Sequence, residues 1–208
     1  MLPSLLTVAQ GLYGLLLLGL WLLLFAASAH LLRLGLWAIA HPLPPNRPPK
    51  LADSELPVVT VQLPMRNERL VAARAIRSAC ALDWPKDKLQ IQVLDDSSAG
   101  DETVSIVDTE VAAQRQFGVD IAVVRRPDRR SFKAGHLDFA LPSARGAFIA
   151  VLDVDFVPAV DFLRQLVPHL VAEPRLAFVQ GRWSFLNENE SLLLRVQALI
   201  LHGLFLVE

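Results

Sequence analysis

The sequence has only one cysteine and almost no excess of charge, and both features exclude classes of protein. Cys80 has no second thiol with which to form an intrachain disulfide, which is compatible with a reducing compartment. It lies within a helical apolar pattern, which favours a small buried side chain. The 20 lysines and arginines are matched by 21 aspartates and glutamates. A nucleic-acid partner is therefore not indicated.

Several signatures of common enzyme classes are also missing. The first predicted strand is not followed by G-x-G-x-x-G, and no G-K-[ST] phosphate loop occurs, which argues against dinucleotide oxidoreductases and P-loop NTPases. There is no G-x-S-x-G elbow of a serine hydrolase. The histidines at positions 30, 41, 136, 169 and 202 lack the spacing of a zinc site.

Charge is almost absent from residues 5–39, where Arg33 is the only charged residue. At about 1.5 Å per residue, such a helix is longer than the roughly 30 Å hydrocarbon core of a membrane. We therefore expect residues 1–40 to form a transmembrane anchor. The sequence Ala27-Ser28-Ala29 would suit signal-peptide cleavage, but no lysine or arginine precedes it and strong apolarity resumes at Leu31.

A proline-rich segment follows the apolar stretch. Residues 41–50 contain five prolines, which predict a stiff extended spacer, and we place the linker at 41–56. No lysine or arginine precedes the apolar helix, whereas Arg33, Arg47 and Lys50 follow its centre. The positive-inside rule then predicts an anchor in the cell (inner) membrane with the following domain in the cytoplasm.

From residue 57 to 208 the pattern predicts alternating strands and helices. Near-continuous apolar strands separated by helices are typical of an α/β fold with a mostly parallel sheet covered on both faces. We expect strands at 58–63, 89–94, 121–124, 148–152 and 176–179, and helices at 70–81, 102–117, 133–141, 160–172 and 191–207.

Polar clusters follow four of these strands, at 64–68, 95–97, 125–133 and 153–155. In an open parallel sheet, ligands bind beyond the carboxyl ends of the strands. Asp153 and Asp155 flank one residue after an apolar strand, so they can hold a divalent cation, Mg²⁺ or Mn²⁺, that takes further ligands from substrate phosphates.

The other clusters allow two interpretations each. Asp95 and Asp96 can accept hydrogen bonds from a ribose or a base, or one of them can cap the helix that starts near Asp101. Lys133 stands at a loop-to-helix junction, where an ammonium group and a helix N-terminus suit a phosphate. A solvated surface lysine is the alternative.

Five motifs carry a resemblance to a known family. They are Val61-Gln-Leu-Pro-Met-Arg-Asn-Glu68, Ile91-Gln-Val-Leu-Asp-Asp-Ser97, Lys133-Ala-Gly135, Asp153-Val-Asp-Phe156 and Val179-Gln-Gly-Arg-Trp183. They resemble, in order and spacing, V-Q-I-P-M-Y-N-E, I-Q-V-L-D-D-S, K-A-G, D-A-D-F and V-Q-A-R-W of family 2 glycosyltransferases of the cellulose synthase type. The cellulose-synthase-like A group, the glucomannan β-mannosyltransferases, is the most similar.

The resemblance implies a GT-A fold and an inverting transfer of sugar from a UDP- or GDP-sugar to a growing β-linked polysaccharide, with further membrane helices forming a polymer channel and a possible synthase complex. It implies that Asp153 and Asp155 hold the metal and diphosphate, and that Gln180, Arg182 and Trp183 line the acceptor side. The donor-binding residues that it implies are Pro64, Asn67, Glu68, Asp95, Asp96, Lys133 and Asp153.

Two departures from the family pattern matter. Arg66 replaces the usual tyrosine, which leaves the base preference open although a guanidinium group can also stack on a base. The family's T-E-D motif with the catalytic base, its Q-x-x-R-W motif and its later membrane helices are expected beyond Glu208. We therefore assign no catalytic residue here and expect this fragment alone to transfer no sugar. A non-processive glycolipid-forming transferase and a non-catalytic nucleotide-sugar-binding subunit are the alternatives.

Overall fold

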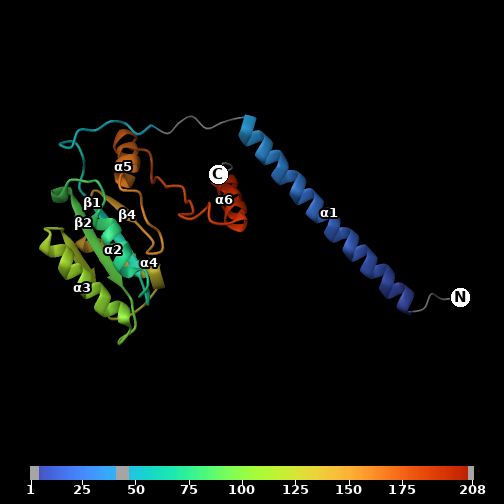
Figure 1. The fold of residues 1–208 in the computed structure, drawn as a ribbon, viewed down its shortest axis with the longest axis horizontal. Coiled ribbons are helices and arrows are strands. Elements are labelled where there is room, and N and C mark those ends of the chain that lie inside the picture. The colour runs from blue at the N-terminus through green and yellow to red at the C-terminus, as the bar shows by residue number, and fades with distance from the viewer. Residues whose placement is uncertain (1–4, 41–46, 206–208) are drawn as a thin grey trace. The chain divides into compact units, whose positions relative to one another are not determined.

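The computed structural model describes residues 5–40 and 47–205 (Figure 1). The strands are β1 (Val59–Met65), β2 (Leu89–Asp95), β3 (Ile121–Val124) and β4 (Phe148–Val151). The helices are α1 (Leu5–Ala40), α2 (Ala72–Cys80), α3 (Glu102–Gln116), α4 (Phe132–Ala140), α5 (Phe162–Ala172) and α6 (Leu192–Phe205), with short 3₁₀ turns at Lys86–Lys88 and Leu141–Ser143.

The prediction of a fifth strand at 176–179 is wrong. The described residues form one parallel sheet of four strands in the order β3-β2-β1-β4, and this segment has no regular structure. An isolated strand leaves its backbone groups without a ladder partner, and Phe178 is 75% exposed. The apolar run therefore has neither the pairing nor the burial that a strand needs.

The strand order fixes where a ligand cleft can form. From β1 the chain proceeds to β2 and β3 on one side, and then returns to place β4 on the other side of β1. Because parallel crossovers are right-handed, α2 and α3 cover one face of the sheet and α4 covers the other (Figure 1). The order in which strands are added to the sheet thus reverses between β1 and β4, which run parallel. This is the switch point at which doubly wound sheets bind ligands.

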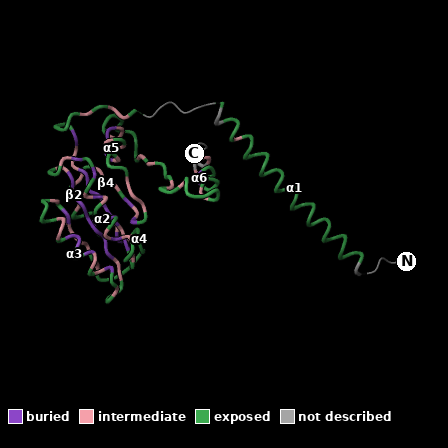
Figure 2. The backbone as a smooth tube through the Cα atoms, in the orientation of Figure 1, coloured by how far each residue is buried: buried purple, intermediate pink, exposed green. Residues whose placement is uncertain are grey.

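The core lies between the sheet and its helices, and the buried segments of Figure 2 coincide with it. Val59, Val61 and Leu63 of β1 are at most 1% exposed. α2 presents Ala75 and Ile76 to this layer, with alanines that allow the helix to approach the sheet closely. Thr60 and Gln62, which alternate with these residues along β1, are also buried, so both faces of the strand are covered.

The face of the sheet under α4 also contains polar side chains. The amide of Gln62 donates to that of Gln92 (2.9 Å), and Gln92 donates in turn to the carbonyl of Ala140 (3.2 Å) and the hydroxyl of Ser143 (2.9 Å). The side-chain nitrogens of both glutamines are hydrogen-bonded, as buried polar groups generally are. They fix the C-terminal end of α4 to the middle of the sheet.

The chain divides into two compact units, Arg47–Gly181 and a second that contains α1 and α6. α1 is long and apolar enough to cross a membrane, a test that an N-terminal signal sequence also passes. Of the predicted spacer, residues 41–46 lie outside the described residues. The part near residue 56 is attached to the sheet unit: Leu56 is buried in the core, and Asp53 pairs with Arg164 of α5 at 2.9 Å.

Candidate functional site

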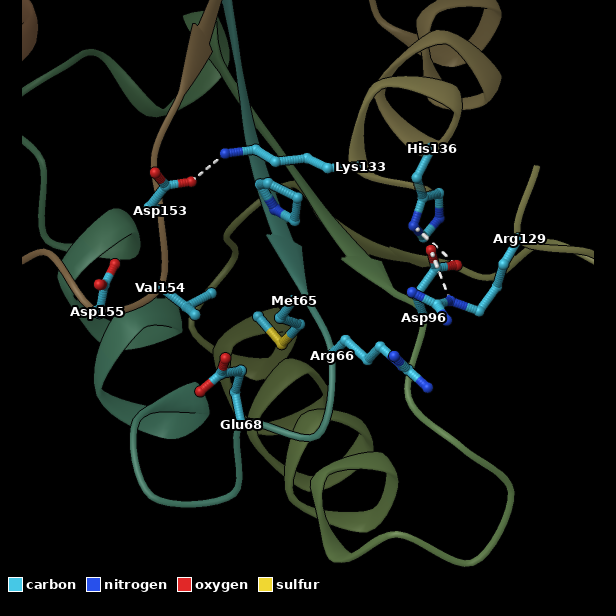
Figure 3. A pocket seen from close by; sticks show the side chains of 11 residues that line it. Met65, Arg66, Glu68, Asp96, Arg129, Lys133, His136, Asp153, Val154 and Asp155 are labelled. Carbon is cyan, nitrogen blue, oxygen red and sulfur yellow. Dashed lines mark hydrogen bonds and ion pairs between the residues drawn. The ribbon is translucent and has the colours of Figure 1, made fainter. Parts of the chain in front are cut away.

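A cleft of about 440 Å³ lies at the carboxyl ends of β1 and β4, at the switch point of the sheet. Of the predicted site residues, Pro64, Glu68, Asp96, Lys133, Asp153 and Asp155 line it, together with Met65, Arg66, Arg129, His136 and Val154 (Figure 3). The expectation that the four polar clusters meet at one sheet edge is therefore confirmed.

Strand β1 runs two residues further than predicted and delivers the first cluster to the cleft. β4 pairs with β1 only as far as Gln62, so Pro64, which has no N–H to donate, lies where the β4 side of the strand is already free. Asn67 follows with a φ of 54°, a left-handed conformation that asparagine tolerates well.

Asn67 connects two loops and is not part of the cleft lining. Its backbone N–H donates to the Ser97 hydroxyl (3.0 Å), and its side-chain oxygen accepts from the Ser98 N–H (2.9 Å). This couples the loop after β1 to the loop after β2. The predicted contact of Asn67 with the donor stays a prediction.

Lys133 and Asp153 approach each other across the cleft from α4 and the end of β4, and form an ion pair (Figure 3). Lys133 is the second residue of α4, as expected for a loop-to-helix junction. Asp155 is exposed, and its carboxylate has no hydrogen-bond or ion-pair partner among the described residues. The lining of the cleft therefore includes one cation and two carboxylates from the ends of α4 and β4.

Asp96 is held at the back of the cleft by three basic side chains. Arg126 binds both of its oxygens (2.9 and 2.6 Å), His136 Nδ1 lies 3.2 Å from Oδ1, and Arg129 Nε lies 3.7 Å from Oδ2. Burial by itself would raise the pKa of Asp96, but the hydrogen bonds from Arg126 and the charges of His136 and the arginines lower it overall. Asp96 is therefore a largely buried carboxylate, its side chain 9% exposed, whose charge is balanced by the protein.

Neither aspartate at the end of β2 caps α3. The cap is Asp101, whose side chain accepts from the Thr103 N–H at 2.9 Å, so the capping alternative is wrong for Asp95 and Asp96. The Asp95 carboxylate is 1% exposed and pairs with Arg125 at 2.9 Å, and it does not line the cleft. Its predicted contact with a base or ribose stays a prediction.

The side chains of the cleft fit a divalent cation whose remaining ligands come from a substrate. Within residues 5–40 and 47–205, no three His, Cys, Asp or Glu side chains are grouped to hold a metal alone. Asp153 and Asp155 nevertheless offer hard oxygen ligands, and Asp153 retains an oxygen that Lys133 does not bind. Mg²⁺ and similar ions commonly take two carboxylates plus phosphate oxygens and water.

Sequence reasoning missed Arg126, Arg129 and His136 as individual site residues. Arg126 and His136 are almost completely buried, with side chains 4% and 2% exposed. His136 Nε2 lies 3.1 Å from the Val124 carbonyl. A buried carboxylate needs a buried partner, so the double aspartate at the end of a strand was the available signal for these basic residues.

The residues predicted for the acceptor side fall in different units. Gln180 lies near the end of the sheet unit, whereas Arg182 and Trp183 belong to the other. The ring of Trp183 packs edge-on against Phe205 of α6, with centroids 6.1 Å apart. The acceptor role of all three stays a prediction.

Comparison with known proteins identifies the family. Residues 60–200 match the family described as glycosyl transferase family 2. The chain is 40% identical over 163 residues to glucomannan 4-beta-mannosyltransferase 9 of Arabidopsis thaliana, covering 76% of the chain and 30% of that relative. It is 43% identical over 158 residues to probable glucomannan 4-beta-mannosyltransferase 7 of Oryza sativa subsp. japonica, covering 74% and 27%.

A solved structure agrees with this assignment. The mannosyltransferase PcManGT from Pyrobaculum calidifontis, in complex with GDP-Man and Mn²⁺, is 28% identical with a TM-score of 0.57, covering 74% of this chain and 42% of that one. The chain spans about 30% of the length of the Arabidopsis relative. With its parallel α/β GT-A fold, its switch-point cleft and these similarities, the chain belongs to glycosyltransferase family 2, alongside the glucomannan mannosyltransferases of the cellulose-synthase-like A group.

Proposed function

We propose that this chain forms the donor-binding part of a membrane-anchored, inverting glycosyltransferase that transfers mannose from GDP-mannose to a growing β-linked polysaccharide. The observation that carries the proposal is the cleft in which Lys133, Asp153 and Asp155 meet at the switch point of the sheet. The choice of GDP-mannose over UDP-glucose is favoured by the names of the plant relatives and of the PcManGT complex.

In this proposal the residues of the cleft bind and orient the diphosphate of the donor. Asp153 and Asp155 hold a divalent cation, which when bound offsets the negative charge that develops on the leaving diphosphate. Lys133 leaves Asp153 to donate to a phosphate oxygen, assisted by the N–H groups at the start of α4. An acceptor hydroxyl then attacks the anomeric carbon in one displacement, and its proton goes to a base that we do not place among these residues.

Calorimetry of the 208-residue chain in detergent tests the proposal. GDP and GDP-mannose should bind in the presence of Mn²⁺, more tightly than UDP and UDP-glucose, and EDTA should weaken binding by more than about tenfold. Tighter binding of the uridine nucleotides would contradict the proposed donor. Equal affinities with and without EDTA would contradict the role of the metal.

The proposal also places the sheet unit on the cytoplasmic face of the cell membrane. The supporting observations are α1, which has the length and composition of a membrane span, and the basic residues Arg33, Arg47 and Lys50 that follow its centre. A reporter enzyme that works only in the cytoplasm should be active when it is fused after Lys50. Activity at this position of a reporter that works only outside the cytoplasm would reverse the topology.

A further inference from the structure

Arg126 lies behind the cleft, where its guanidinium group connects β2 to the start of α4. On one side it binds both oxygens of Asp96. On the other, its Nη1 donates to the Arg130 carbonyl (2.7 Å) and its Nη2 to the Phe132 carbonyl (2.6 Å). Its side chain is 4% exposed. One buried cation thus joins the end of a strand to the turn that precedes Lys133.

That turn has an unfavourable backbone conformation. Ser131 and Phe132 have φ values of 56° and 47°, the left-handed region that residues other than glycine and asparagine rarely adopt. The Ser131 side chain makes no capping hydrogen bond, and Phe132 is 70% exposed. Strained conformations persist only where the surroundings fix them, and the two hydrogen bonds from Arg126 to the carbonyls of this turn are side-chain interactions that do so here.

Gly135 shows how closely Arg126 packs against α4. A Cβ atom at this position would overlap the Arg130 carbonyl and lie 2.9 Å from Arg126 Nη1. The guanidinium group therefore occupies the space beside the first turn of α4. The direction of this turn determines where Lys133 places its ammonium group.

We propose that Arg126 is a positioning residue: it holds the left-handed turn at Ser131 and Phe132 and thereby aims Lys133 at the diphosphate of the donor. The proposal deepens the proposed function and rests on it. It requires the planar fork of arginine, because only a fork can bind Asp96 and two carbonyls together. A lysine would keep the positive charge beside Asp96 but lose this geometry.

Binding of GDP with Mn²⁺, measured by calorimetry on the 208-residue chain in detergent, tests the proposal. Arg126→Lys and Arg126→Gln should each bind GDP about tenfold more weakly, the effect of losing a hydrogen bond to a charged group. In a Lys133→Gln background, Arg126→Lys should cause no further loss. Arg115→Gln is the matched control, because Arg115 also donates to a backbone carbonyl, that of Ile121 (2.8 Å), at the opposite end of the sheet.

Ser131→Gly provides a suppressor of the predicted defect. Glycine adopts the left-handed conformation without strain, so this change should restore most of the GDP affinity to Arg126→Lys while leaving the affinity of the parent chain unchanged. Two results would overturn the proposal: wild-type affinity in Arg126→Lys, which would mean that Arg126 only balances the charge of Asp96, or no recovery with Ser131→Gly. If Arg126→Gln does not fold, Arg126→Lys, alone and combined with Ser131→Gly, gives the same comparison.

Hydrogen exchange separates this inference from the proposed function, because it needs no ligand. The amides of residues 130–135 should exchange faster in Arg126→Lys and slow again when Ser131→Gly is added. Unchanged exchange in Arg126→Lys would overturn the role of Arg126 in the turn. Failure of the unmodified chain to bind GDP, with the exchange pattern as expected, would instead count against the proposed function alone.

Discussion

The ammonium group of Lys133 is paired with the carboxylate of Asp153 across the switch point of the sheet. The same lysine and the same aspartate are proposed to bind the diphosphate and the metal, so each is held by the other before the donor arrives. Donor and cation must therefore displace this ion pair.

The first prediction concerns the competition between Lys133 and a metal for Asp153. Lys133→Gln removes a positive charge from the metal site, so Mn²⁺ should bind the donor-free chain several-fold more tightly. The same change should weaken GDP binding about tenfold or more, because a charge-assisted contact to phosphate is lost. Titrations of Mn²⁺ and of GDP check the two effects. Lys86→Gln, an exposed lysine before β2, should change neither affinity.

The second prediction concerns the two carboxylates after β4. Asp153→Asn and Asp155→Asn each remove a negative ligand, so GDP should bind either variant with little difference between Mn²⁺ and EDTA. Asp87→Asn changes an exposed carboxylate in the 3₁₀ turn before β2 and should retain the full metal dependence. A strong metal dependence in both variants of the pair would show that the cation is held elsewhere.

Much of the fold could be predicted because its cause is local in the sequence. The strands β1, β2 and β4 are short segments of mostly apolar and β-branched residues between helical patterns, and this alternation along the chain implies a parallel sheet. The segment at 176–179 was also apolar, but whether it forms a strand depends on a partner, which no local pattern contains. Phe178 is instead exposed.

The candidate site was predictable at the level of the sheet edge and less so at the level of individual contacts. Asp153 follows β4 and Lys133 lies at the start of α4, and the topology of the sheet brings these two ends together. In contrast, Asn67 joins two loops through Ser97 and Ser98, and Asp95 faces Arg125 away from the cleft. These contacts depend on how the loops turn after each strand, which residue type and spacing do not determine.

The third prediction concerns stability between pH 7 and pH 5. Burial lowers the pKa of His136, although the charge of Asp96 opposes this. The unfolded chain therefore takes up a proton near the ordinary histidine pKa of about 6.5, before the folded chain does. This contribution to stability is complete above that pH and is lost as the pH falls through the lower pKa of the folded state.

Thermal unfolding of the chain in detergent at a series of pH values measures this effect. The midpoint should fall as the pH is lowered from 7 to 5, and His136→Gln should flatten the dependence in that range. The lowered pKa of Asp96 acts at more acid pH: its contribution is present above the unfolded carboxyl pKa of about 4 and is lost below it. An equally steep fall between pH 7 and 5 in His136→Gln would assign the proton uptake to another group.

The fourth prediction compares two glycines that are needed for different reasons. Gly118 follows α3 with a φ of 76° and has nothing within 4 Å of the position of a Cβ atom, so Gly118→Ala should cost about 1–2 kcal/mol of backbone strain alone. Gly135 is inside α4, where an added Cβ would overlap the Arg130 carbonyl and press on Arg126. Gly135→Ala should therefore destabilise the chain by a different mechanism, overpacking of about 1–3 kcal/mol, and should also displace Lys133.

Denaturant unfolding and GDP calorimetry distinguish the two glycines. Both variants should lose stability, but only Gly135→Ala should lose GDP affinity, by about tenfold if the contact of Lys133 with the diphosphate is broken. Full GDP affinity in a folded Gly135→Ala chain would mean that the first turn of α4 does not control where Lys133 points.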